Sequence, residues 1–380
     1  MRTIAVVTGT RAEYGYLKPL MDAINKDQDL QLIPLITGMH LLPSFGKTCD
    51  IVKKDFPNSF TIPMELPGDS LYDMGHYLAS GIKNFSSYFH TNTPDILIVL
   101  GDRSESLAAA FAAMYQNVPI AHINGGDVSG GTIDESIRHA LTKIAHIHFT
   151  HTKENAKRVQ QLGEEEKRIF VTGALSLDVI YNQQLLSKKK VFSKYHLDPH
   201  QTTYLMVQHP ITTLPDRGIS QFKTVLSVMD SLQHQTVLLY PNCDAGGQSF
   251  ISMIEDFKRP YLHKFKSIPH VDYLSLLKAV DILIGNSSSG IIEAAAFQKP
   301  VVNVGGRQQG RVRSDNVLSV EPKKKEILNA VNMITQDALF QKKCKQCVNI
   351  FGDGHASEKI IEILKTIDIS PDFIKKQITY

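Results

Sequence analysis

Three aspartates in the stretch 94–149 have the residue type and the setting for acid–base chemistry. Asp102 and Asp127 each come shortly after a strand-like apolar run, and Asp134 stands where a helix is expected to begin. Loop aspartates are most often only solvated. Here, however, the three lie on neighbouring loops that also carry glycines, and removal of a weakly acidic C–H proton needs a carboxylate whose pKa is tuned by its neighbours. We therefore expect Asp102, Asp127 and Asp134 to be catalytic.

These aspartates need a framework that brings strand ends together. Apolar runs at 96–100 and 120–123 flank an alanine-rich helical stretch, a pattern that predicts a strand–helix–strand unit. Thr132 and Glu135 have the spacing of a capping box, which predicts a helix that starts near Asp134. Because parallel α/β sheets hold ligands at the carboxyl ends of their strands, we expect the three aspartates to serve one site.

A second candidate site is the loop 285–290, Gly-Asn-Ser-Ser-Ser-Gly, between an expected strand and an expected helix over 291–297. Free N–H groups at a helix start, together with the hydroxyls of Ser287 and Ser288, would suit a diphosphate. The alternative is a plain turn with a serine cap. A Walker A loop is excluded, because no Gly-Lys-Ser/Thr follows. Glu293 lies one turn further on, where a carboxylate could accept hydrogen bonds from a ribose diol.

Three other residues stand at expected strand ends or on glycine-rich loops. Arg11 follows the first strand, and its alternative role is a surface ion pair with Glu13. His209 ends a strand of the second half, where it could act as a ligand or an acid. Arg307 begins a loop with two further arginines, and guanidinium groups suit phosphate oxygens.

Composition excludes several classes of protein. The chain has 42% hydrophobic and 21% charged residues and a net charge of +3, so it offers no case for nucleic-acid binding or for an anionic membrane. The apolar runs are strand-length, well short of the roughly 20 residues of a spanning helix, and no signal peptide is expected. Cys344 and Cys347 form a CxxC in a lysine-rich helical segment without a second pair, which indicates bystander thiols. We expect a cytoplasmic protein with no metal and no cofactor.

The 380 residues are too many for one ordinary core. Strands and helices alternate in both halves, which predicts an α/β protein with two doubly wound Rossmann-like domains. We place the first domain at 1–175, a lysine-rich connection at 176–200 and the second domain at 201–365. The tail 366–380 is placed outside both domains, and the resemblance of the motifs to a known family implies that it returns to the first domain.

The motifs together resemble a known family, the hydrolysing UDP-N-acetylglucosamine 2-epimerases of sialic acid and related nonulosonic acid pathways. The resemblance covers roughly residues 1–320 in the right order. It implies a glycosyltransferase-B-like fold with the active site in the interdomain cleft, and no metal or dinucleotide. The motifs that carry it are TGTRAEYG, LGDRSES, GGDVSGGTIDESIRHALTK, QHP, PNCDAGG, GNSSSGIIE and GGRQQGR.

The resemblance also implies a reaction. UDP is lost across C1–C2 to give 2-acetamidoglucal, and hydration then gives N-acetylmannosamine. Asp127 is our choice for the base that takes the C2 proton, with Asp102 and Asp134 assisting proton transfer and hydration. His209 and Arg11 are expected to meet the diphosphate and its departing charge.

Binding roles follow from the same resemblance. Ser287, Ser288 and Gly290 are assigned to the phosphates, and Glu293 to the ribose of UDP. The residues assigned to the sugar are Arg103, Asn242, Asp244 and Arg307.

Two departures from the family pattern bear on the reaction and the substrate. Non-hydrolysing relatives carry a glutamate where this chain has Asn124, which favours the hydrolysing branch. Asp127 stands where several members have glutamate, which shortens its reach by one methylene. The alternative substrate is UDP-2,4-diacetamido-2,4,6-trideoxyglucose (UDP-N,N'-diacetylbacillosamine) of legionaminic acid synthesis.

Other functions remain open at this point. They are a UDP-sugar glycosyltransferase of the same fold, a catalytically dead UDP-sugar sensor and a non-hydrolysing epimerase. The expected partners are a UDP-N-acetylhexosamine substrate and the product UDP. We expect a homodimer or homotetramer.

Overall fold

The computed structural model describes residues 1–43, 46–68, 70–130, 132–241 and 246–379, which form two compact units. The first unit contains Met1–Asp127, Asp134–Asn182 and Phe351–Tyr380, and the second contains Val128–Ile133 and Gln183–Ile350. Residues 351–365, which the sequence-based boundaries gave to the second domain, therefore belong to the first unit.

The first unit is built on a seven-stranded sheet in which every neighbouring pair is parallel. The strand order reverses between β1 and β4, which makes their carboxyl ends the expected ligand edge. The strands, in spatial order, are β3 (Phe60–Ile62), β2 (Leu30–Thr37), β1 (Arg2–Thr8), β4 (Ile96–Leu100), β5 (Ile120–Ile123), β6 (Ile147–Thr150) and β7 (Ile169–Val171).

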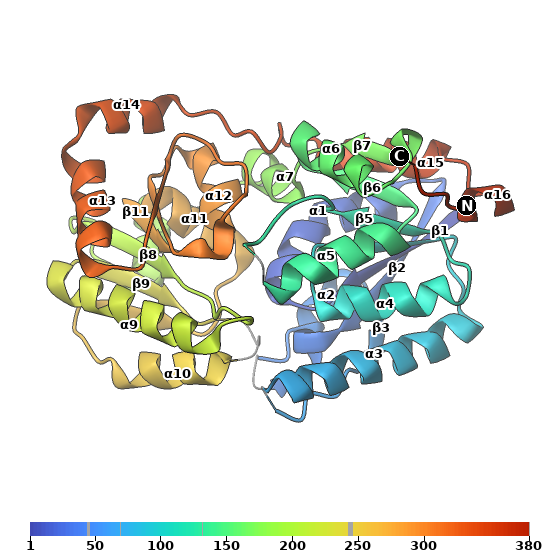
Figure 1. Ribbon diagram of the computed structural model, residues 1–380, viewed down its shortest axis with the longest axis horizontal. Helices are drawn as coiled ribbons and strands as arrows, with labels where there is room; N and C mark the ends of the chain where they lie inside the picture. The colour runs from blue at the N-terminus through green and yellow to red at the C-terminus, as the bar shows by residue number, and fades with distance from the viewer. Residues whose placement is uncertain (44–45, 69, 131, 242–245, 380) are drawn as a thin grey trace. The chain divides into compact units, whose positions relative to one another are not determined.

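Helices cover both faces of this sheet. The three longest on one face, α3 (Leu71–Thr91), α4 (Ser104–Met114) and α5 (Ile133–Ile144), run side by side in Figure 1. On the other face α1 (Arg11–Lys26) packs with α7 (Leu175–Asn182) and α15 (Ala356–Thr366). The shorter elements of this unit are η1 (Gly38–Leu41), α2 (Cys49–Asp55), α6 (Lys153–Gln161), η3 (Glu166–Arg168) and α16 (Pro371–Ile374).

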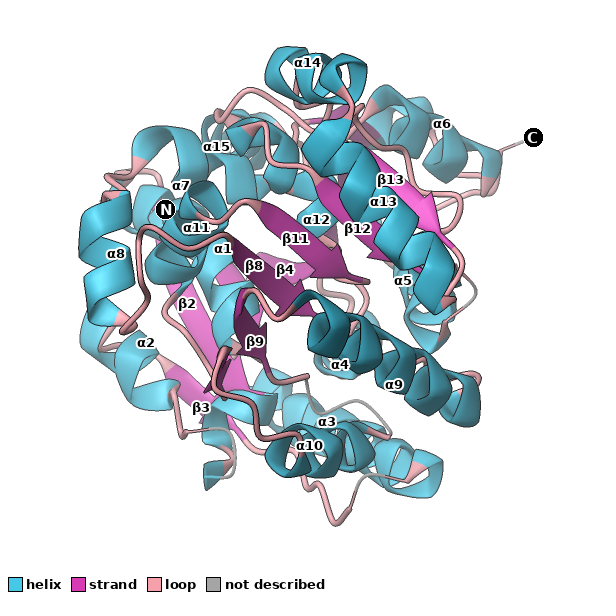
Figure 2. Cartoon of the chain, turned by 90° about the vertical axis from the view of Figure 1, so that its left-hand side faces the viewer, coloured by secondary structure: helices cyan, strands magenta, loops and turns pink. Residues whose placement is uncertain are grey.

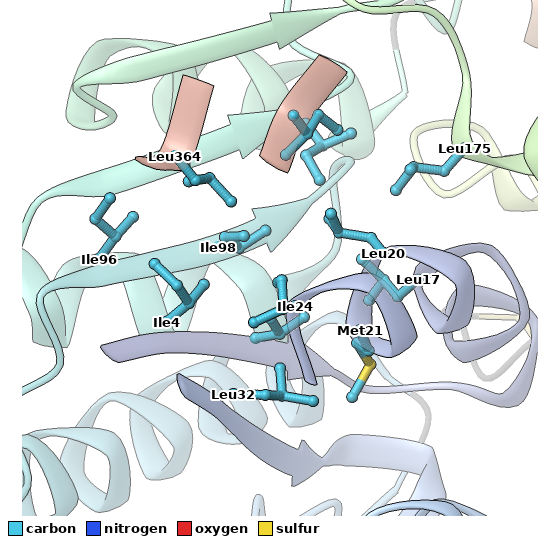
Figure 3. Packing of buried hydrophobic residues seen from close by; sticks show 14 of the residues in the cluster. Ile4, Leu17, Leu20, Met21, Ile24, Leu32, Ile96, Ile98, Leu175 and Leu364 are labelled. Atoms are coloured by element: carbon cyan, nitrogen blue, oxygen red, sulfur yellow. The ribbon is translucent and has the colours of Figure 1, made fainter. Parts of the chain in front are cut away.

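Helix α1 forms the centre of the second of these layers. Its apolar stripe, which includes Leu17, Leu20 and Ile24, is completely buried against the strands. Figure 3 shows this stripe directed toward Ile98 of β4, with Leu364 of α15 packed in the same cluster. The last long helix of the chain thus completes the core of the first unit.

The residues after α15 remain attached to the first unit. Lys376 donates hydrogen bonds to the carbonyl oxygens of Lys143, at 2.8 Å, and Ala145, at 2.6 Å, which lie at the carboxyl end of α5. Its ammonium also pairs with Glu164 at 2.6 Å. A cation at this end of a helix satisfies carbonyls that have no partner within the helix.

The second unit contains a six-stranded, fully parallel sheet, whose strands β9, β8, β11, β12 and β13 run side by side in Figure 2. Helices α9 and α13 pack together on one face. The strands, in spatial order, are β10 (Leu262–Phe265), β9 (Gln235–Leu239), β8 (Thr203–Val207), β11 (Ile282–Gly285), β12 (Val301–Val304) and β13 (Val317–Val320). The helical elements are α8 (Lys188–Lys194), α9 (Pro215–Leu232), α10 (Gly247–Asp256), α11 (His270–Ala279), α12 (Ser289–Ile292), η4 (Ala294–Phe297), η5 (Gly306–Gln308), α13 (Lys324–Gln336) and α14 (Ala338–Gln346).

The predicted fold class, two doubly wound Rossmann-like domains, is confirmed by these two sheets. Among the described residues, no helix is long and apolar enough to cross a membrane. The thiols of Cys344 and Cys347 are buried, and burial raises the pKa of Cys344 to about 11. A protonated, buried thiol is a poor nucleophile and a poor metal ligand.

The packing of α15 can be tested by truncating one side chain. Leu364→Ala should lower the free energy of unfolding by about 2–5 kcal/mol, because it leaves a cavity at a completely buried position. Leu339→Ala is the control, since that side chain is 74% exposed and should change the value by less than about 0.5 kcal/mol. Urea unfolding measures both, and equal small effects would contradict the described packing.

Candidate active site

The carboxyl ends of β1, β2 and β4 meet around the completely buried carboxylate of Glu105. Arg103 donates from Nε to Oε2 at 3.1 Å and from Nη2 to Oε1 at 3.2 Å, and the Tyr77 hydroxyl donates to Oε1 at 2.8 Å. A Cβ on Gly9 or Gly38 would lie 2.8 or 2.6 Å from Glu105 atoms. Glycine is required at both strand ends because the carboxylate packs directly on the backbone. The guanidinium of Arg103, which we assigned to the sugar, is thus already bonded to Glu105.

Glu13 lies on the same edge of the sheet, in the first turn of α1. Its side chain is 4% exposed, so the predicted alternative of a surface ion pair with Arg11 is wrong for this residue. Oε2 accepts the N–H of Gly9 at 2.6 Å, whereas Oε1 is buried without a hydrogen-bond partner among the described residues. Burial, aided by the negative charge of Glu105, raises the pKa of Glu13 to about 7. Its carboxyl group can therefore change protonation state near neutral pH.

His40, at the end of β2, is completely buried on this edge. Its Nε2 lies 3.1 Å from the Thr8 hydroxyl and its Nδ1 lies 2.7 Å from the Thr48 hydroxyl. Burial lowers the pKa of His40 to about 4, and the charge of Arg11 acts in the same direction. The imidazole is therefore neutral at neutral pH, and the two hydroxyls fix its orientation.

An ion pair joins one of the three predicted catalytic aspartates to the helix that carries another. Asp102 follows β4 and pairs with Arg138 of α5, whose side chain is completely buried. Asp134 lies one helical turn before Arg138, in the first turn of α5. The buried cation cannot lose its counter-ion without a large cost, so the Asp102 loop and the start of α5 are held in one arrangement.

A buried histidine supports the turn before Asp102. The Nε2 of His122, on β5, lies 2.7 Å from the carbonyl oxygen of Gly101, which has a left-handed φ of +73°. Burial lowers the pKa of His122 to about 3, so the ring is neutral and Nε2–H donates to that carbonyl. The sequence alone did not single out this residue.

The third aspartate, Asp127, follows the neighbouring strand and is 1% exposed. Leu100 of β4 and Ile123 of β5 are register partners, so Asp102 and Asp127 stand two and four residues beyond a matched pair. The carbonyl of Gly126 accepts hydrogen bonds from Asn155, at 3.0 Å, and from Arg158. This loop is therefore fixed by α6 rather than free in solution.

In the second unit, Asn286 organises the second candidate site. Its side chain is completely buried and bonds His209 twice, with Oδ1 accepting the backbone N–H at 2.7 Å and Nδ2 donating to the carbonyl at 2.9 Å. The backbone oxygen of Asn286 accepts from Arg307 at 3.2 Å and from Gln308 at 2.8 Å. Three predicted site segments, those of His209, Ser287 and Arg307, are thereby brought to one point.

Gly285 makes this junction possible. It has φ +141°, and a Cβ there would lie 2.0 Å from the carbonyl oxygen of Val207. Any other residue would separate the ends of β8 and β11. The hydrogen bonds between Asn286 and His209 depend on that close approach.

The helix predicted over 291–297 is wrong. Residues 289–292 form a single α-helical turn, α12, followed by the 3-10 turn η4. So short a helix contributes little macrodipole, and an anion here would depend on N–H groups and hydroxyls. Ser288 occupies the N-cap without a side-chain capping bond, whereas the Ser287 hydroxyl accepts the backbone N–H of Ser289 at 3.4 Å, so the alternative of a serine cap stays open.

Other predicted positions are only partly tested by the geometry. Gly290 is buried against Leu283 and Val301, while Asn242 and Asp244 lie outside the described residues. Among the described residues, no group of three or more His, Cys, Asp or Glu side chains could hold a metal ion.

The raised pKa of Glu13 predicts a pH-dependent stability. The native state binds this proton more tightly than the unfolded chain, so wild-type stability falls as the pH rises from about 4.5 to about 7. Glu13→Gln keeps an acceptor for Gly9 but cannot ionise. The free energy of unfolding of this variant, relative to that of wild type, should therefore increase across this window, by up to about 3 kcal/mol at pH 8.

Urea unfolding at several pH values measures this difference. Glu154→Gln at an exposed position of α6 is the control and should shift the curve little at any pH. If the difference in free energy of unfolding between Glu13→Gln and wild type is the same at pH 5 and pH 8, Glu13 does not hold a proton in the native state with a raised pKa.

Comparison with known proteins agrees with these motifs. The family model described as UDP-N-acetylglucosamine 2-epimerase matches residues 22–365. A UDP-N,N'-diacetylbacillosamine 2-epimerase (hydrolyzing) of Legionella pneumophila is 36% identical over 99% of both chains. A GDP/UDP-N,N'-diacetylbacillosamine 2-epimerase (hydrolyzing) of Campylobacter jejuni is 35% identical over 84% of both chains. A UDP-N-acetylglucosamine 2-epimerase of Neisseria meningitidis is 32% identical over 90% of this chain and 89% of that one.

Solved structures share the fold. The Neisseria meningitidis UDP-GlcNAc 2-epimerase bound to UDP-GlcNAc matches with a TM-score of 0.79 at 18% identity, over 96% of this chain and 99% of that one. The co-structure of S. aureus MnaA with UDP matches with a TM-score of 0.76 at 22% identity, over 96% of both chains. These matches show the shared fold, and the family model and the relatives above establish that the chain belongs to the UDP-N-acetylglucosamine 2-epimerase family.

Proposed function

We propose that the protein is a hydrolysing 2-epimerase whose substrate is UDP-2,4-diacetamido-2,4,6-trideoxyglucose. The observation that carries this choice is the pair of relatives at 36% and 35% identity that are named for this sugar. Both matches extend over the aspartate loops and the 285–290 loop, since they cover at least 84% of this chain.

The proposed reaction has two halves. A base removes the C2 proton, the C1–O bond breaks and UDP leaves with the electron pair, which gives a C1=C2 glycal. Water then adds its oxygen to C1, while C2 receives a proton on the opposite face. The products are UDP and the free sugar of manno configuration.

The first unit would act on the sugar carbons. Asp127 is the proposed base, since it is buried, lies at a strand end and is held by a loop fixed to α6. Asp102 and Asp134 would assist proton transfer and hydration beside the fixed charge of Arg138. A pre-set orientation of these groups lowers the cost of reaching the transition state.

The second unit would hold the nucleotide. Ser287, Ser288 and the N–H groups near Gly290 would bind the diphosphate, with His209 and Arg307 held beside them by Asn286. Glu293 would accept from the ribose. In the first unit, Arg11 at the start of α1 would meet the departing charge. Because Asn286 holds the segments of His209 and Arg307, these groups would need little rearrangement as charge develops on the leaving group.

The hydrolysing outcome is supported by the residue before the two glycines. Asn124 adopts a left-handed conformation, with φ +70°, and asparagine tolerates this better than glutamate does. Its Oδ1 is buried without a partner among the described residues. An uncharged amide here cannot serve as the acid that the non-hydrolysing relatives carry at this position.

UDP-N-acetylglucosamine is the second candidate substrate. The Neisseria meningitidis relative named for it is 32% identical to this chain. The two sugars differ in the groups at C4 and C6, so the choice depends on the pocket around those carbons.

NMR in D2O with each substrate in parallel tests the proposal. Stoichiometric UDP and a free manno sugar deuterated at C2 are expected from the diacetamido substrate, with a kcat/KM at least about tenfold above that for UDP-N-acetylglucosamine. A higher kcat/KM for UDP-N-acetylglucosamine would make that compound the substrate instead. A nucleotide-linked manno product, or UDP release only with an added acceptor, would overturn the hydrolysing reaction.

Asp127→Asn should retain UDP binding and lose turnover by at least about 100-fold, because it removes a base without removing an anion contact. Calorimetry with UDP and the NMR assay measure the two effects. The control is Asp372→Asn, at a side chain that is 87% exposed. Turnover that survives in Asp127→Asn would show that another group takes the C2 proton.

The double variant Ser287→Ala, Ser288→Ala should weaken UDP binding by about 1–3 kcal/mol, the range for lost hydrogen bonds to a charged group. Its matched control removes Ser227 and Ser231, whose hydroxyls bond only carbonyls of their own helix, α9. An unchanged UDP affinity in the first variant would place the phosphate site elsewhere.

A further inference from the structure

A chain of hydroxyl groups connects α11 to the carboxylate proposed for the ribose. The Tyr273 hydroxyl donates to the Oγ of Ser289 at 2.5 Å, and that Oγ donates to Oε2 of Glu293 at 2.5 Å. The second bond ends on a carboxylate oxygen, and hydrogen bonds to an ionised acceptor are stronger than those between neutral groups. Ser289 and Glu293 are 5% and 2% exposed, so little water competes with these bonds.

The direction of this chain is fixed. Burial, followed by the negative charge of Glu293, raises the pKa of Tyr273 far above its usual value, so the phenol remains a donor at any working pH. Because the Oγ of Ser289 accepts from Tyr273, its own O–H donates to Glu293.

The N–H of Glu293 donates to the Ser289 carbonyl at 2.9 Å, but this backbone bond does not set the orientation of the carboxylate. The residue stands between α12 and η4, at the junction of two single helical turns. A glutamate side chain has several rotamers, and burial in one of them costs conformational entropy. The bond from Ser289 selects one orientation of the carboxylate, and Tyr273 holds Ser289 in the rotamer that makes this bond.

We propose that Tyr273 is a positioning residue for nucleotide recognition, which acts through Ser289 to hold the Glu293 carboxylate where it accepts from the vicinal hydroxyls of a ribose. The inference rests on the proposed function for UDP binding and extends it to a residue outside the loop. Tyr273 itself touches no ligand in this scheme. The ligand class it serves is a nucleoside diphosphate with an intact ribose diol.

Tyr273→Phe tests this, because it removes one oxygen and keeps the ring. Calorimetry with UDP and with 2',3'-dideoxy-UDP should show a loss of roughly 5- to 10-fold for UDP and less than about twofold for the dideoxy compound. KM should rise by a similar factor, with kcat unchanged within about twofold. Ser289→Ala should give the same pattern, and the double variant should not be additive.

Tyr195→Phe is the matched control. The hydroxyl of Tyr195 donates to Asp272 of the same helix, α11, at 2.6 Å, so this variant also removes one phenol–carboxylate bond there. It should leave both affinities unchanged. A loss in Tyr195→Phe equal to that in Tyr273→Phe would overturn the proposal, because general loosening of α11 would then explain the effect.

Two further outcomes separate this inference from the proposed function. If wild type binds UDP and Tyr273→Phe binds both compounds like wild type, or loses both equally, the positioning role is wrong and the proposed function stands. If wild type does not bind UDP at all, both are overturned.

Discussion

The ion pair between Arg138 and Asp102 is the constraint on which the first unit's chemistry depends. Arg138 is among the largest completely buried side chains of the described residues, and a buried guanidinium must keep its counter-charge. The turn after β4 and the first turn of α5 can therefore not shift independently. Lys376 anchors the opposite end of the same helix. A helix fixed at both ends holds its first turn in place, and this turn carries Asp134, one of the proposed catalytic residues.

In the second unit, the loops of the candidate site are held together by the neutral amide of Asn286. The side-chain amide of Asn286 bonds the backbone at the end of β8, and its backbone carbonyl accepts a hydrogen bond from Arg307. The groups of Asn286 that hold these segments together are therefore uncharged. This leaves cationic and hydroxyl groups for an anion. The contrast follows from the two tasks, because a base needs neighbours that tune its pKa, whereas a diphosphate needs donors that are already aligned.

The alternation of strands and helices and the glycines at strand ends were sufficient to predict the fold class and the position of the aspartate loops, because both depend on local pattern. Glu105, Glu13 and His40 escaped prediction because their importance comes from burial, which depends on three strands that are distant in sequence. A glutamate in the first turn of α1 has the same local pattern whether it faces water or the core. The helix expected after Gly290 failed for a similar reason, since its apolar sequence also fits a short turn buried beneath β12.

A difference in residue chemistry distinguishes the candidate groups of the first unit from those of the second. On the first unit, Glu13 can gain or lose a proton near neutral pH, while the charges of Glu105 and Arg103 act on it and His40 stays neutral. On the second, Tyr273 and Ser289 pass a hydrogen bond to Glu293 in one direction only. Changes of pH near 7 should therefore act on the β1 end of the first sheet and leave the orientation of Glu293 unchanged. A catalyst that must hold its nucleotide while protons move at the sugar gains from this separation, because binding and proton transfer then respond to different conditions.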